Sequence, residues 1–197
     1  MVKVLIISLL FFQGRVLNTP NITLNFDIIL HKKVVGSLKF TQITKDGMTY
    51  YQSVTNIKTR LIKDILVNYR YAVEFDYSLL KKADVHIIVN KKPHAKTHTL
   101  WEDSHYQISK NDDGEKTLKD SITFSTIQLY FKESINISSC YSEQDGSFNT
   151  IVPMGNHSYK KINSKGKENM YYYKNGILKK ATIDGGLISF EMIAREQ

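Results

Sequence analysis

The chain has 197 residues, a length that fits one domain with a core of useful size. Apolar residues make up 42% and charged residues 23%, which excludes an intrinsically disordered protein. The net charge of +8 suggests a polyanion partner, but the lysines fall in scattered pairs without a basic stripe, so we expect no nucleic-acid binding. We expect these pairs to keep turns soluble and sheet edges unpaired; they are Lys32-Lys33, Lys81-Lys82, Lys91-Lys92, Lys160-Lys161 and Lys179-Lys180.

Residues 1–18 have the pattern of a secretory signal peptide. Lys3 precedes a run from Val4 to Phe12 that is apolar except for one serine, and Gln13-Gly14-Arg15 ends it. The run is too short to span a bilayer but matches the core of a signal peptide, with a buried first strand as the alternative. We therefore expect an exported protein, periplasmic or at the cell surface. No cysteine follows the run, so we do not expect a lipoprotein, and no later segment has the length of a membrane-spanning helix.

Residues 19–197 are expected to form a single domain of β-strands. Apolar side chains alternate with polar ones along residues 22–30, 69–77, 85–89 and 188–192. A period of two is typical of strands with one buried and one wet face. Turn signals such as Lys45-Asp46-Gly47 and Asn175-Gly176 separate these runs at hairpin spacing. Because such short links join antiparallel neighbours, the sequence predicts an all-β, mainly antiparallel fold with a curved sheet.

Two segments are ambiguous. Asp120-Ser121 is placed to cap one short helix in which Ile122, Thr126 and Leu129 share a face, although the β-branched content also allows a strand. The stretch from Thr59 to Val67 fits helical spacing as well, and we interpret it as part of a strand pair.

No catalytic, metal or cofactor site is predicted. His94 and His98 on a strand would lie about 13 Å apart, too far for one zinc ion, so we expect them and His105 to be surface histidines of an edge strand. The acid pairs Glu102-Asp103 and Asp112-Asp113 fall where turns are expected. The single cysteine, Cys140, is expected to be a small buried residue rather than a nucleophile.

Aromatic residues are the most suggestive feature, with 12 tyrosines and nine phenylalanines along the expected strands. One interpretation is that they pack the sheet against the elements that cover it. The other is a concave face for a hydrophobic or amphipathic ligand. On that interpretation Phe26, Tyr71, Phe75 and Tyr130 line the face.

Three short motifs carry a resemblance: Leu129 to Glu133, Tyr141 to Gly146, and Asn169 to Gly176. In these motifs, and over about residues 22–193, the chain resembles a Bacteroidota family of roughly 200-residue exported β-proteins, a domain of unknown function. Its order of strands, one short helix and further strands is more loosely similar to half-barrel or open-barrel lipoprotein-carrier proteins, which hold acyl chains on a curved sheet. The resemblance implies no catalytic residues.

The resulting hypothesis is a non-enzymatic exported protein that binds a lipid, another amphipathic molecule or an envelope protein on its concave face. Two alternatives are an envelope hydrolase, whose polar groups converge from separate strands, and a structural component of an envelope assembly.

Overall fold

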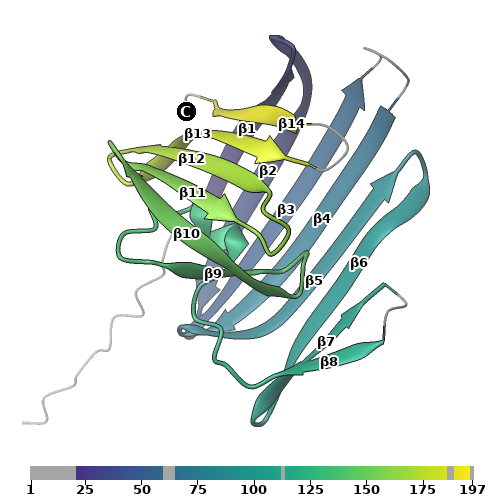
Figure 1. The fold of residues 1–197 in the computed structure, drawn as a ribbon, viewed down its shortest axis with the longest axis vertical. Coiled ribbons are helices and arrows are strands. Elements are labelled where there is room, and N and C mark those ends of the chain that lie inside the picture. The colour runs from purple at the N-terminus through teal and green to yellow at the C-terminus, as the bar shows by residue number, and fades with distance from the viewer. Residues whose placement is uncertain (1–20, 60–64, 112–113, 186–188, 196–197) are drawn as a thin grey trace, which may run out of the picture.

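The structure, a computed structural model, describes residues 21–59, 65–111, 114–185 and 189–195 (Figure 1). Within them the chain forms one 3₁₀-helix, η1 (Thr126–Tyr130), and fourteen strands. The first eight strands are β1 (Ile22–Leu30), β2 (Lys33–Lys45), β3 (Met48–Thr59), β4 (Ile65–Asp76), β5 (Leu79–Val89), β6 (Lys92–Glu102), β7 (His105–Lys110) and β8 (Glu115–Leu118). After η1 follow β9 (Ser139–Ser142), β10 (Ser147–Gly155), β11 (Ser158–Ile162), β12 (Glu168–Lys174), β13 (Ile177–Asp184) and β14 (Ser189–Ala194).

All fourteen strands belong to one sheet, in the order β8-β7-β6-β5-β4-β3-β2-β1-β14-β13-β12-β11-β10-β9. Every pairing between neighbours is antiparallel, and two-residue turns such as Asp46-Gly47 and Asn175-Gly176 have the positive φ angles that tight hairpins need. The sheet does not close, because β8 and β9 remain its two edges. The predicted all-β, mainly antiparallel fold, a curved sheet or open barrel with one short helix, is confirmed by this single unclosed sheet.

The sheet bends back over itself. Strands β9–β13 lie in front of the long strands β1–β4, and the pairing of β1 with β14 joins the two halves (Figure 1). Inward-facing residues of both halves therefore meet in one core. Along β2 to β5 these buried residues alternate with outward-facing ones, as the period of two predicts.

The link from β8 to β9, residues 119–138, runs between the two halves and fills the space there. We call it the crossing segment. Backbone amides of Leu80 and Tyr141 donate to its carbonyl oxygens at Ile122 and Phe124, each at 2.9 Å, and the Tyr173 hydroxyl donates to Leu129 at 2.6 Å. Its apolar side chains are buried: Ile122, Phe124, Ile127 and Leu129. The crossing segment is thus bonded to both halves of the sheet.

The helix in the crossing segment starts later than predicted. It begins at Thr126 with Ser125 as N-cap, so the placement of its start at Asp120-Ser121 is wrong. The Ile122 carbonyl accepts from Leu80 of β5, which keeps this residue outside the helix. The Gln128 side chain accepts from the Ser125 amide at 3.0 Å and satisfies a donor at the helix start.

The strand interpretation of the second ambiguous stretch is confirmed at its ends, where Thr59 pairs with Ile65 and Ile57 with Val67. Residues 60–64 lie outside the described residues, as do residues 1–18 with the predicted signal peptide. The signal peptide and the domain division therefore stay predictions.

The turn between β9 and β10 closes the open side of the bend by side-chain contacts. Thr97 of β6 donates from its hydroxyl to the Gln144 carbonyl at 2.9 Å, and the hydroxyls of Thr99 and Tyr141 are 2.8 Å apart. Lys110 of β7 also donates to the Asp145 carbonyl in this turn at 3.4 Å. We call the contact of β6 and β7 with β9 and the β9–β10 turn the seam.

Candidate functional site

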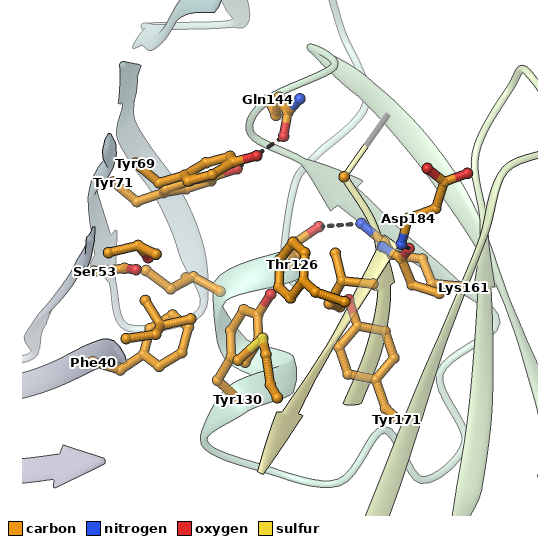
Figure 2. Close-up of a pocket in the computed structure, with 18 residues that line it drawn as sticks. Phe40, Ser53, Tyr69, Tyr71, Thr126, Tyr130, Gln144, Lys161, Tyr171 and Asp184 are labelled. Atoms are coloured by element: carbon orange, nitrogen blue, oxygen red, sulfur yellow. Dashed lines mark hydrogen bonds between the residues drawn. The ribbon is translucent and has the colours of Figure 1, made fainter. Parts of the chain in front are cut away.

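A cavity of about 110 Å³ that opens to solvent lies between the two halves of the sheet, beside η1 (Figure 2). It is smaller than the roughly 150 Å³ cavity that admits benzene in an apolar core, so it has room for a few heavy atoms. The lining residues are Leu38, Phe40, Ser53, Thr55, Tyr69 and Tyr71 from β2–β4, Thr126, Ile127 and Tyr130 from η1, and Gln144, Lys161, Asn169, Tyr171, Ile183, Asp184, Gly185, Phe190 and Met192 from the other half.

One side of the cavity is aromatic. Tyr130 stacks on Phe40 with ring centroids 4.0 Å apart and meets Tyr171 edge-on at 6.1 Å, so it bridges the two halves. Tyr69 and Tyr71 project from β4, and the Tyr71 hydroxyl donates to the Gln144 side chain at 3.1 Å (Figure 2). Burial raises the pKa of Tyr71, Tyr130 and Tyr171 well above the usual value, so they offer ring faces and neutral hydroxyls.

The other side of the cavity is polar and contains a buried cation. Lys161 of β11 is 7% exposed, and its Nζ donates to the Thr126 hydroxyl at 3.2 Å (Figure 2). The Thr126 hydroxyl in turn donates to the Tyr141 carbonyl at 3.2 Å. Within the described part of the chain, Lys161 has no carboxylate oxygen within 4.0 Å, and Asp184 across the cavity pairs with Lys167 at 3.6 Å.

Two further buried titratable groups lie behind this polar side. Glu143 is 1% exposed, its Oε1 accepts from the Ile127 amide at 3.0 Å, and burial raises its pKa while Lys161 acts in the opposite direction. Cys140 is fully buried, and burial raises the pKa of its thiol to about 11. The thiol stays protonated at neutral pH and is a poor nucleophile, which agrees with its predicted role as a small buried residue.

The sequence of this domain matches a known protein family. The family DUF6134, described as a domain of unknown function, matches residues 26–195. The chain belongs to the DUF6134 family. No curated protein matches it. Among solved structures, the chain is similar to the crystal structure of a β-barrel-like protein of the domain of unknown function DUF1849 from Brucella abortus. The TM-score is 0.55 at 12% identity, over 90% of this chain and 96% of the other, a likeness that concerns the fold alone.

The four aromatic residues predicted to contact a ligand occupy two different environments in this DUF6134 domain. Tyr71 and Tyr130 both line the cavity, and Tyr130 belongs to η1 rather than to a strand. Phe26 and Phe75 are 1% exposed and are not among the lining residues. Phe26 packs edge-on under Phe40 at 5.8 Å, so it supports the aromatic side from behind.

Lys161 is a lining residue whose position the sequence interpretation misjudges. The expectation that the pair Lys160-Lys161 keeps a turn soluble or a sheet edge unpaired is wrong for Lys161, which is buried. Its neighbour Lys160 faces outward and pairs with Glu168 at 2.8 Å. The signal was present in the alternation, because Tyr159 and Lys161 share one face of β11.

The predicted histidines lie apart from the cavity. His94 and His98 belong to β6, which lies inside the sheet between β5 and β7, so their assignment to an edge strand is wrong. His98 Nδ1 is 2.7 Å from Asp84 Oδ1. Partial burial acts to raise the pKa of Asp84, but the hydrogen bonds from His98 and Lys82 lower it overall.

Glu102 and Asp103 lie at the β6–β7 turn as predicted, and Asp112 and Asp113 lie outside the described residues. Among the residues that the structure places, no group of three or more His, Cys, Asp or Glu side chains is arranged to hold a metal ion. None of the helices in these described residues is long and apolar enough to cross a membrane.

Proposed function

We propose that this DUF6134 protein is a non-enzymatic binding protein, exported to the periplasm or cell surface, that holds part of a hydrophobic or amphipathic molecule in the cavity between its two sheet halves. The observation that supports the proposal is the cavity itself. It combines stacked aromatic rings with a few polar groups, which is the usual composition of a small-molecule site. Its size suits a head group or a chain end, with the remainder of the molecule outside the opening.

The alternative of an envelope hydrolase finds less support around this cavity. The Cys140 thiol is protonated, and the Glu143 carboxylate accepts from the Ile127 amide instead of facing the cavity. The Glu143 carboxylate therefore anchors the start of η1, and the protonated Cys140 thiol is a poor nucleophile.

Native mass spectrometry of the full-length chain tests the proposal. The protein is produced with its N-terminal segment in a Gram-negative host, and the periplasmic fraction is purified without detergent. We expect a discrete added mass that organic solvent removes. The protein's own mass also reports whether residues 1–18 are cleaved.

Matched variants connect the bound molecule to the cavity. Ser53 lines the cavity at 3% exposure, so Ser53→Leu fills part of it with apolar volume. Gln52→Leu places the same side chain on the exposed outer face of the same strand. We expect the added mass to disappear from S53L and to persist in Q52L. A bare mass for the folded wild-type chain would contradict the proposal and favour a protein partner in the envelope.

A further inference from the structure

A buried cation in the cavity indicates the chemistry of the ligand, given the proposed binding function. Burying a charged group is costly unless an opposite charge and hydrogen bonds compensate. Lys161 is 93% removed from solvent, yet its described hydrogen-bond partner is a neutral hydroxyl, that of Thr126. The cavity therefore contains a buried cation without a direct ion pair in the described chain, although Glu143 acts on it electrostatically from behind the cavity.

The carboxylates of Glu143 and Asp184 both lie farther than 4.0 Å from Lys161 Nζ. Glu143 is buried behind the cavity, where its Oε1 accepts from the Ile127 amide. Neither oxygen of the Glu143 carboxylate comes within 4.0 Å of Lys161 Nζ. Asp184 lines the cavity and pairs with Lys167 at 3.6 Å. Neither carboxylate forms a direct ion pair with Lys161.

The donor count of Lys161 allows a ligand at this point. An ammonium group has three N–H donors, and one is used by Thr126. Two donors on one cation suit the two oxygens of a carboxylate, and the small volume of the cavity favours this planar group. The apolar side chains Phe40, Tyr130 and Met192 line the same space and would contact the adjoining carbon chain.

We propose that the cavity binds a monocarboxylic acid with an apolar chain, the carboxylate paired with Lys161 and the chain against the aromatic side. The ligand supplies the direct ion pair that Lys161 lacks in the described chain. An uncharged ligand of the same shape would leave Lys161 unpaired and bind more weakly.

The experiment compares hexanoate with hexan-1-ol by isothermal titration calorimetry on the delipidated full-length protein. We expect hexanoate to bind about ten- to hundredfold more tightly than the alcohol, the range for a charge-assisted hydrogen bond. In Lys161→Met the acid should lose this advantage, while the alcohol binds at least as well as before. Lys160→Met removes one charge from the outer face of the same strand and should leave the preference intact.

Each other outcome has a distinct meaning. Equal affinity of both probes for the wild type would overturn the carboxylate assignment and leave the proposed function standing. A preference for the acid that persists in K161M would overturn the role of Lys161. If neither probe binds and the decyl pair (decanoate and decan-1-ol) also fails, the cavity takes no amphipathic ligand and both proposals fall. Folding of K161M is checked by its thermal midpoint, which should not decrease, because methionine fills a similar volume without a charge.

Discussion

At the scale of single residues, Glu143 couples the stability of the protein to pH. Its carboxylate is 1% exposed and accepts from the Ile127 amide at the start of η1. Burial raises the pKa of Glu143 above its ordinary value of 4.5. Between 4.5 and that raised pKa, the folded state therefore binds more protons than the unfolded state, and stability decreases as the pH rises through this window.

The variant Glu143→Gln tests this linkage. Glutamine keeps an oxygen for the Ile127 amide but does not titrate, so the variant should gain stability relative to the wild type as the pH rises above 4.5, and the difference should level off at higher pH. Urea unfolding from pH 4 to pH 8 measures the difference, with Glu102→Gln as a control for the loss of one acid at an exposed turn. A difference that does not change with pH would show that the burial of Glu143 is not coupled to its protonation.

At the scale of elements, the crossing segment depends on a buried tyrosine. Tyr106 of β7 is 0% exposed, its hydroxyl donates to the Leu80 carbonyl at 2.9 Å, and the hydroxyl oxygen accepts from the Ile122 amide at 3.3 Å. Tyr106→Phe keeps the ring and leaves both backbone groups without this partner. We expect a loss of about 1–3 kcal/mol in the free energy of unfolding, the cost of unsatisfied buried polar groups.

The control for this prediction is Tyr172→Phe. Tyr172 lies on β12 with 37% exposure, and its loss of a hydroxyl should change stability by no more than about 0.5 kcal/mol. Urea denaturation at constant m-value compares the two variants. Equal stability of Y106F and Y172F would mean that water replaces the Tyr106 hydroxyl and that the crossing segment does not depend on it.

At the scale of the whole molecule, local patterns predict the strands but not how they come together. Alternation along β4 and turn residues such as Asn175-Gly176 are local signals, and they led to the correct fold class. The pairing of β1 with β14 joins residues from opposite ends of the chain, for which no local signal exists.

The same distinction explains the site. The alternation of apolar and polar residues shows which face of a strand a residue occupies, and it predicts inward faces for Phe26 and Tyr71. It does not show which inward residues meet a cavity and which meet the core, because that depends on where the crossing segment lies. Lys161 was misassigned because a lysine pair normally indicates solvent exposure, although its position two residues after Tyr159 indicated an inward face.

The bend of the sheet is stabilised at the seam, where Gly146 fits against Ile108. Gly146 has φ +66°, and a Cβ added there would come within 2.9 Å of Ile108 Cγ2. Gly155 has a similar φ of +84°, and no atom of the described residues beyond its chain neighbours lies within 4 Å of the added Cβ. Gly155→Ala should therefore cost about 1–2 kcal/mol for the backbone conformation alone. Gly146→Ala should cost about 1–3 kcal/mol more, because it also overpacks the seam.

A double-mutant cycle with Ile108→Ala separates the contact from the backbone strain. Ile108 is 3% exposed, so its truncation alone should destabilise the protein, but it also removes the methyl group that the new Cβ would meet. The combined loss for G146A and I108A should then be smaller than the sum of the single losses, by about 1 kcal/mol or more. The pair of Ile108→Ala with Gly155→Ala should be additive. Urea unfolding measures both cycles. Additivity in both would show that the β9–β10 turn does not contact β7 tightly, and that the seam does not hold the two halves of the sheet together.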